Sequence, residues 1–356
     1  EGDSFGEAEP NGKTVVVDYS SPNIGKLLAF HHLRSTMIGN SLLRCYRAAG
    51  WKGVGINHLG DWGTQFGKLI VMARRSGKPL DDEALKAFDL PTLNALYVEF
   101  GKQAKENPEL EEEARAAFAA MEAEDPEALR LWRSFRATTL AEIEELYQML
   151  NVQFDDYTGE SFFNDKTDEV VELLKEKSLL TKSQERQVVS LEAEEMPPCL
   201  ILKGDGSTLY ATRDLAAALH RHRTYSFDRC LYVVDNGQSL HFKQVFTVLK
   251  KMGYSWAEGC IHIPFGLILQ RDEEGKWSKG SSKQGNSNSL REVIEAARDV
   301  ILEMIENKNP GLQNKEQTAL EIGIGALVFN DLKNRRLIDV KFDWDQVLSF
   351  EGDTGP

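Results

Sequence analysis

A β-branched run near the start of the chain restricts the possible folds most. Residues 13–21 read KTVVVDYSS, which is typical of a buried strand that ends in a turn. Helical spacing follows from about residue 30 to 48, and GWKGVGINHLGDWG then predicts a second short strand with a glycine-rich exit. A strand, a helix and a strand within about 45 residues form a βαβ unit, which requires a parallel sheet with a right-handed crossover.

Strands and helices alternate again in the second half of the chain. CLILKGDGSTLY is predicted as a strand, a Gly-Asp-Gly turn and a short second strand, and RCLYVVD and CIHIPFGLIL are further strands. The helix that opens with YATRD is predicted to be capped near Thr212. Between the two halves, Ala, Glu and Leu dominate, and helices are predicted near 82–105, 108–122 and 126–150. The fold class is therefore α/β, a doubly wound parallel sheet divided by a helical insertion. The predicted boundaries are 1–75 and 196–310 for the two halves, 76–195 for the mainly helical insertion and 311–356 for a helical end.

Composition excludes some classes of protein and leaves others open. The formal net charge of −14 argues against a wholly basic nucleic-acid coat protein, but TRDLAAALHRHR and DLKNRR are locally basic. No apolar run is long enough to cross a membrane, and the N-terminus has no basic-then-apolar signal, so we expect a cytoplasmic protein. The four scattered cysteines predict reduced, mostly buried thiols, with no protein-ligated metal.

Two motifs follow the first two predicted strands, where ligands of such sheets bind. SSPNIGKLLAFHH runs into a helix whose free N–H groups suit a phosphate, with Lys26 and His32 beside it. A capped helix with solvated histidines explains this motif equally well. GINHLGDWG places Asp61 among glycines, where it either binds a hydroxyl pair such as a ribose or caps the next helix.

Three further motifs come from the second half of the chain. Tyr210 and Asp214 are four residues apart, so one helical face can present a phenol and a carboxylate to a cation; a simple helix cap is the alternative. The loop EEGKWSKGSSKQGN carries lysines that can follow developing phosphate charge, or it is a solvated turn. Gln238 and His241, which open a helix after LYVVD, form a weaker candidate site.

Six blocks of this sequence together resemble the arginyl-tRNA synthetases, a family of class I aminoacyl-tRNA synthetases. They read SSPNIGK, HLRST, NHLGDWGTQFG, YATRDLAAAL, QSLHFKQVF and FDWDQVLSFEGDTGP, in the order of that family, and span about residues 14 to 356. The resemblance implies a Rossmann-like catalytic domain with a connective insertion and a helical stem. It also implies that arginine attacks ATP, that pyrophosphate leaves, and that the arginyl group moves to the 3′ end of tRNA(Arg).

The resemblance also implies roles for individual residues. The arginine ligands would be Asp18, Ser20, Asn23, Tyr210, Asp214 and Gln238. The ATP-binding residues would be Lys26, His32, Gly60, Asp61, Gln238, His241, Lys276 and Ser278, with Mg²⁺ accompanying the ATP. The catalytic residues would be His31, His32, Lys276 and Lys279, with Lys283 further along the same loop.

Some positions depart from the pattern of the family. Where the class motif reads His-x-Gly-His, this chain has Ala29 and His31 in place of the first histidine and the glycine. Asp18 replaces a glutamate, and the lysine loop reads KWSKGS. These departures keep two alternatives open: a non-catalytic arginine-binding module, and an enzyme that activates arginine without tRNA.

A tRNA partner requires a basic surface on this acidic chain. The candidates are Arg221, Arg223, Lys333, Arg335 and Arg336, and each cluster is equally compatible with a solvated face. The family usually adds an N-terminal domain for the tRNA elbow and a C-terminal anticodon-binding domain, and we expect both to be missing from this sequence. We expect a monomer, with no membrane partner.

Overall fold

The computed structural model describes residues 5–204, 206, 208–271, 275–278, 289–349 and 351–355. The chain divides into two compact units. Unit 1 comprises Glu1–Ser21, Ile38–His58 and Phe154–Gly266, and unit 2 comprises Pro22–Met37, Leu59–Gln153 and Leu267–Pro356. Helix α1, His32–Ala48, begins in unit 2 and ends in unit 1. The segment 76–195, predicted as one insertion, is thus divided between the units after Gln153.

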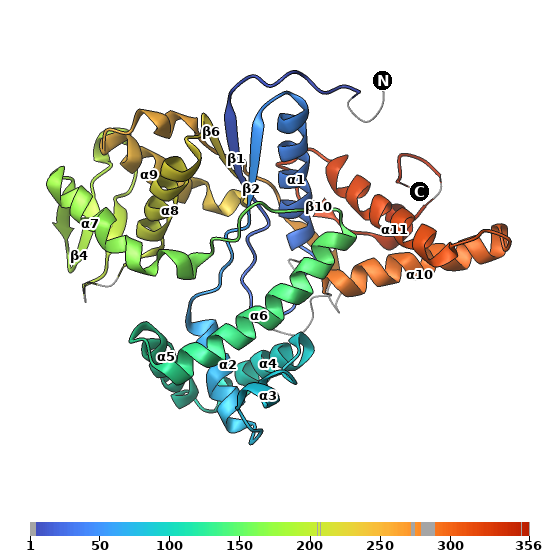
Figure 1. The fold of residues 1–356 in the computed structure, drawn as a ribbon, viewed down its shortest axis with the longest axis horizontal. Coiled ribbons are helices and arrows are strands. Elements are labelled where there is room, and N and C mark those ends of the chain that lie inside the picture. The colour runs from blue at the N-terminus through green and yellow to red at the C-terminus, as the bar shows by residue number, and fades with distance from the viewer. Residues whose placement is uncertain are drawn as a thin grey trace. The chain divides into compact units, whose positions relative to one another are not determined.

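Unit 1 is built on the predicted parallel sheet (Figure 1). Its strands are β1 (Thr14–Asp18), β2 (Lys52–Ile56), β6 (Arg229–Tyr232) and β7 (Cys260–His262), in the order β2-β1-β6-β7. All three pairings are parallel, and Val15, Val16 and Val17 of β1 have no exposed surface. The strand order reverses at β1, which makes its carboxyl end a switch point of the sheet. The α/β prediction is confirmed.

The same unit contains helices and a second, antiparallel sheet. The helices are α7 (Thr167–Glu176), α8 (Tyr210–Tyr225) and α9 (Ser239–Lys251), with 3-10 turns at Glu160–Lys166, Glu192–Glu194, Asn236–Gln238 and Ser255–Gly259. The second sheet joins β3 (Leu180–Ser183), β4 (Arg186–Val189) and β5 (Cys199–Leu202). Strands β3 and β4 were not predicted, because five of their eight residues are polar and the alternating pattern of a half-buried strand is missing.

The predicted cap of α8 at Thr212 is wrong. The helix begins two residues earlier, at Tyr210, and its N-cap residue, Leu209, makes no side-chain capping bond. Thr212 is buried, and its hydroxyl donates to the carbonyl oxygen of Ile201 at 2.6 Å. The threonine therefore ties α8 to β5 and does not cap the helix.

Unit 2 contains the predicted helical bundle: α2 (Thr64–Arg75), α3 (Asp82–Leu85), α4 (Leu90–Glu106), α5 (Glu109–Glu122) and α6 (Pro126–Met149). Aspartate carboxylates at positions 81, 89 and 125 accept backbone N–H groups at the starts of α3, α4 and α6. Helix α6 packs against α2, α4 and α5 (Figure 1), and Phe135 and Ile143 face this core. The helices predicted at 108–122 and 126–150 are confirmed to within one residue at each end, whereas the helix predicted at 82–105 is divided into α3 and α4.

The last part of unit 2 begins with a short sheet. It comprises β8 (Ile268–Arg271), β9 (Trp277–Ser278) and β10 (Val340–Lys341), followed by α12 (Trp344–Val347). CIHIPFGLIL was predicted as one strand but forms β7 and β8, because Pro264 lies between them and has no N–H to donate.

Two long helices, α10 (Leu290–Lys308) and α11 (Lys315–Leu332), pack side by side in this unit (Figure 1). Ser289 and Glu292 form a capping box at the start of α10. No helix within the described ranges has the length and apolar character needed to span a membrane.

Candidate functional site

The turn after β1 carries an unusual backbone. Ser20 and Ser21 have φ angles of 66° and 45°, which few residues other than glycine adopt. The Ser21 hydroxyl donates to Oδ1 of Asp18 at 2.7 Å, and its backbone N–H donates to Oδ1 of Asn57 at 3.1 Å. These bonds join the carboxyl ends of two adjacent strands. Such conformations cost about 1–3 kcal/mol each and are retained where surrounding contacts hold them, often at functional sites.

Asp18 has a partner that the sequence did not predict. Its Oδ2 lies 2.8 Å from Nη2 of Arg221 in α8, and the two side chains are 9% and 1% exposed. Burial acts to lower the pKa of Arg221, but Asp18 and neighbouring groups outweigh this and raise it, so the guanidinium is charged. Arg221 therefore does not lie on an exposed tRNA-binding surface, because its charge is buried against Asp18.

The predicted readers of a cationic substrate lie at the starts of α8 and α9. Tyr210 is the first residue of α8 and is 70% exposed, and Asp214 lies one turn further along the same helix. Nε2 of His241, in α9, lies 2.6 Å from Oδ2 of Asp214. Gln238 is the exposed N-cap residue of α9. The structure thus joins Asp214 and His241 directly and leaves the Asp214 side chain 24% exposed, which suits a carboxylate that accepts bonds from a cation.

In unit 2, Asn23 lies directly against Gly60. The two residues form a parallel bridge, in which Gly60 N–H donates to the Pro22 carbonyl at 3.0 Å and Ile24 N–H donates to the Gly60 carbonyl at 3.2 Å. A Cβ atom at Gly60 would lie 1.9 Å from Oδ1 of Asn23, so a larger residue at position 60 would displace the Asn23 side chain. Asn23 itself is exposed.

Asp61 does not have either of its predicted roles in this structure. Gly63, with no side chain to cap, is the N-cap residue of α2. The Asp61 side chain has no exposed surface, and its Oδ2 lies 2.7 Å from Nε of Arg136 in α6. A fully buried carboxylate that is already paired does not offer its oxygens to a ribose.

The start of α1 holds two adjacent histidines. The rings of His31 and His32 are 4.2 Å apart, and Nδ1 of His32 lies 3.0 Å from the carbonyl oxygen of Ala29. Because a carbonyl only accepts, Nδ1 carries the proton and the orientation of the His32 ring is fixed. The first turn of α1 contains no acidic residue, so its positive end is compatible with an anion. Nζ of Lys26 lies 5.8 Å from the centre of the Tyr97 ring.

The lysine loop is described only in part. Lys276 is exposed, and Ser278 lies in β9 opposite Gln270 of β8. Lys279 and Lys283 lie outside the described residues. The role predicted for this loop therefore stays a prediction.

The remaining basic candidates differ in their surroundings. Arg223 makes two bonds of 3.0 and 2.6 Å to the carboxylate of Glu169. Lys333 donates to the carbonyl oxygen of Asp353 at 2.6 Å. Arg335 and Arg336 are both exposed at the end of α11, so these two stay candidates for a phosphate-binding surface.

Three arginines pair with buried aspartates in a way that the sequence did not predict: Arg34, Arg136 and Arg221. Arg34 donates to Oδ1 of Asp331 at 2.6 Å and to the carbonyl oxygens of Arg336 and Ile338 at 2.9 and 3.1 Å. Burial raises the pKa of the Asp331 carboxyl, although Arg34 opposes this. The one available signal of a buried arginine was its place on the apolar face of a helix. Arg221, for example, lies four residues after the buried Ala217 and therefore on the same face of α8.

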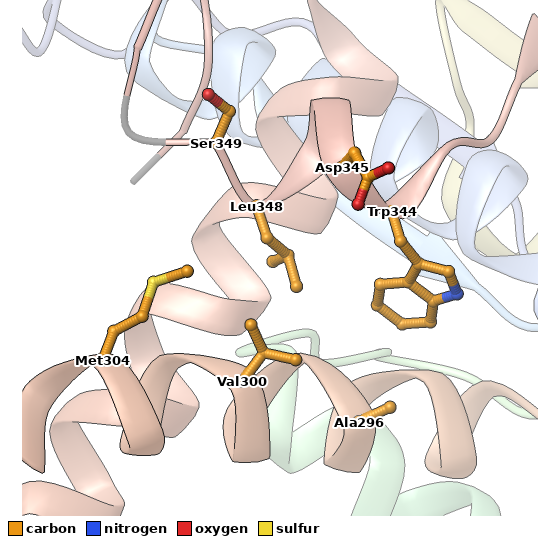
Figure 2. Close-up of a pocket in the computed structure, with 7 residues that line it drawn as sticks. All are labelled: Ala296, Val300, Met304, Trp344, Asp345, Leu348 and Ser349. Atoms are coloured by element: carbon orange, nitrogen blue, oxygen red, sulfur yellow. The ribbon is translucent and has the colours of Figure 1, made fainter. Parts of the chain in front are cut away.

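Other features of the surface and core involve residues that were not predicted as site residues. Figure 2 shows a groove of about 510 Å³ in unit 2, lined by Ala296, Val300, Met304, Trp344, Asp345, Leu348 and Ser349. Burial raises the pKa of the Cys230 thiol to about 11, so this thiol is protonated at neutral pH and is a poor nucleophile. Among the residues that the structure describes, no group of three or more His, Cys, Asp or Glu side chains could hold a metal ion.

Known proteins resemble this chain over its whole length. The family model described as "tRNA synthetases class I (R), catalytic domain" matches residues 1–344. Relatives named arginine–tRNA ligase include one from Alkaliphilus metalliredigens, 50% identical over 100% of this chain and 62% of its own, and one from Exiguobacterium sibiricum, 51% identical over 99% and 62%. The chain thus spans about three fifths of the length of these relatives.

Solved structures agree in fold. The Plasmodium falciparum arginyl-tRNA synthetase superposes with a TM-score of 0.77 at 29% identity, over 97% of this chain and 57% of that one. The Thermus thermophilus arginyl-tRNA synthetase superposes with a TM-score of 0.81 at 22% identity, over 98% of this chain and 63% of that one. The Rossmann-like architecture predicted from the sequence is therefore confirmed.

Proposed function

The chain belongs to the class I tRNA synthetase (R) family, and from this premise we propose that it is the catalytic core of an arginine–tRNA ligase. It activates arginine with ATP, releases pyrophosphate and transfers the arginyl group to the 3′ end of tRNA(Arg), with release of AMP. The observation that carries the proposal is the identity of about 50%, over the whole chain, to proteins named arginine–tRNA ligase. We further propose that the protein acts in the cytoplasm.

Arginine recognition is assigned to the starts of α8 and α9 in unit 1. Asp214 is the main ligand of the guanidinium, because a planar fork of N–H donors is matched by a partly exposed carboxylate. Tyr210, which is exposed one turn earlier on the same helix, and Gln238 complete this pocket. The pairing of His241 with Asp214 orients the carboxylate.

Asp18 has a different part in this proposal. Its charge is compensated by Arg221, so the pair as a whole is neutral. Asp18 therefore contributes to the arginine ammonium as a hydrogen-bond acceptor beside the Ser20 turn, and Asp214 supplies a partly exposed carboxylate to the guanidinium.

ATP recognition is assigned to unit 2. The N-terminus of α1 and the His32 ring face the phosphates, Lys276 adds charge, and the backbone at Gly60 faces the adenosine. Mg²⁺ accompanies the nucleotide and would be held by phosphate oxygens, since the described residues offer no cluster of ligands. Catalysis in this scheme consists of positioning and charge stabilisation.

One specific observation favours a second candidate function. Ala29 stands where the class motif has its first histidine, so a paralogue that binds arginine but does not activate it is the alternative. Such a protein would keep the Asp214 pocket and lose the ATP chemistry.

The test is aminoacylation of bulk tRNA by the whole natural protein with each amino acid in turn. The proposal requires arginine to be charged and the other amino acids to remain at background. Arginine binding without ATP–pyrophosphate exchange, in the presence of tRNA, would support the binding paralogue.

A further inference from the structure

We propose that Arg136, on the insertion helix α6, is a positioning residue for the contact between Asn23 and Gly60. Its role in the reaction rests on the function proposed above. Arg136 belongs to none of the motifs that suggested this function, and it reaches the contact through Asp61.

The contact between Asn23 and Gly60 tolerates little displacement. Gly60 exchanges two backbone hydrogen bonds with the Pro22–Ile24 segment, and its Cα lies so close to Asn23 that a Cβ would meet Oδ1 at 1.9 Å. Gln65 adds a third bond by donating from Nε2 to the Gly60 carbonyl at 3.0 Å. Three hydrogen bonds therefore hold the Gly60 backbone against the Asn23 segment.

The residue after Gly60 is held at two points by α6. Oδ2 of Asp61 accepts from Nε of Arg136 at 2.7 Å, and the backbone carbonyl of Asp61 accepts from Nε1 of Trp132 at 2.7 Å. Asp61 has no exposed surface, so its carboxylate has lost the solvation that water would give it. A buried carboxylate without its cation would move toward water or take up a proton, and the adjacent Gly60 would move with it.

Helix α6, which carries Arg136 and Trp132, is itself fixed by packing. It packs against α2, α4 and α5, and Phe135, next to Arg136, has no exposed surface. The ring of Trp132 also lies edge-on to that of Trp62, at 5.2 Å between centres. The insertion thus fixes a segment to which the family resemblance assigns contacts with arginine and adenosine.

Hydrogen exchange in the whole natural protein tests the positioning itself, without any assay of activity. The variant is Arg136→Met, which keeps an unbranched apolar side chain and removes the guanidinium and its charge. The matched control is Arg130→Met on the same helix, because Arg130 pairs with Asp82 at 2.9 Å on the exposed surface. We expect peptides that contain the Gly60 and Ile24 amides to exchange at least about tenfold faster in Arg136→Met than in the control, with peptides from α10 unchanged.

Two results would overturn the positioning role. One is unchanged exchange at Gly60 and Ile24; the other is an equal acceleration in α10, which would indicate general destabilisation. If Arg136→Met does not fold, Arg136→Lys keeps the charge without the fork geometry, and a smaller but local acceleration is expected from it.

A kinetic measurement then tests the consequence for the reaction. A displacement of about 1 Å costs about 100-fold in rate, so kcat/KM for arginine-dependent ATP–pyrophosphate exchange should fall about that much in Arg136→Met and less than about threefold in Arg130→Met. Local loosening with unchanged kcat/KM would refute the link to catalysis. If none of the amino acids supports ATP–pyrophosphate exchange by the parent protein, the proposed function fails. Hydrogen exchange would still decide whether Arg136 positions Gly60.

Discussion

Replacing Arg221 by methionine tests the buried ion pair behind the β1 turn. The substitution keeps much of the volume and removes the charge, so Asp18 is left buried with the Ser21 hydroxyl as its remaining described polar side-chain contact. Breaking a buried pair in this way typically costs about 3–5 kcal/mol of unfolding free energy. The guanidinium also lies 5.2 Å from the centre of the Tyr232 ring, and methionine restores part of that packing.

The pH sets an upper limit on this loss. A buried carboxylate that has lost its cation can take up a proton, and protonating an ordinary aspartic acid at pH 7 costs about 4 kcal/mol, because its pKa is about 3.9. At pH 5 the same step costs about 1.5 kcal/mol. In the variant the folded state binds more protons than the unfolded state in this range, so the variant gains stability as the pH falls. The deficit should therefore shrink from about 4 to about 1.5 kcal/mol.

Urea unfolding at both pH values, followed by circular dichroism, measures this deficit. The double variant Arg221→Met with Asp18→Asn is the control, because it removes both charges and should abolish the dependence on pH. A deficit that stays the same at pH 5 and pH 7 would mean that lost packing, and not an uncompensated carboxylate, explains the effect. A deficit below about 1 kcal/mol at pH 7 would show that the pair is solvated.

Three further predictions concern the proposed site. Asp214→Asn should weaken arginine binding by about 3–5 kcal/mol and ATP binding much less; calorimetry that finds equal losses would refute the assignment. His32→Ala should lower the rate of adenylate formation about 100- to 1,000-fold, and a larger loss in His31→Ala would mean that the histidines are misaligned. Changing Arg335 and Arg336 to alanine should reduce the salt dependence of tRNA binding. The slope of log binding constant against log salt concentration should fall by about one for each lost phosphate contact, and an unchanged slope would show that these arginines do not bind phosphate.

The local elements of the fold could be predicted because their signals are local. The β-branched run of β1 carries its own pattern within a few residues. Strands β3 and β4 could not be predicted, since five of their eight residues are polar and their stability depends on pairing within the sheet that includes β5.

The candidate site was only partly predictable for a similar reason. Motifs predict site roles for Asp214 and Gly60, and these stay predictions. The partners of the buried carboxylates come from distant parts of the chain, as with Arg34 and Asp331, which are 297 residues apart. Arg221 was assigned to a basic surface because spacing alone does not show which face of α8 is buried. In each case tertiary packing, and not local sequence, decided where the charge lies.

The most direct test of the proposed function is the choice of amino acid in ATP–pyrophosphate exchange by the whole natural protein, with tRNA present. Arginine, lysine and citrulline separate the need for a positive charge from the need for a planar group. Lysine keeps the charge without the planar guanidinium, and citrulline keeps the planar shape without the charge. We expect exchange with arginine, and at least about 1,000-fold lower kcat/KM with the other two, since a site that pairs a buried polar group rejects analogues that leave it unsatisfied. Exchange with lysine or citrulline at a comparable rate, or none with arginine, would contradict the account.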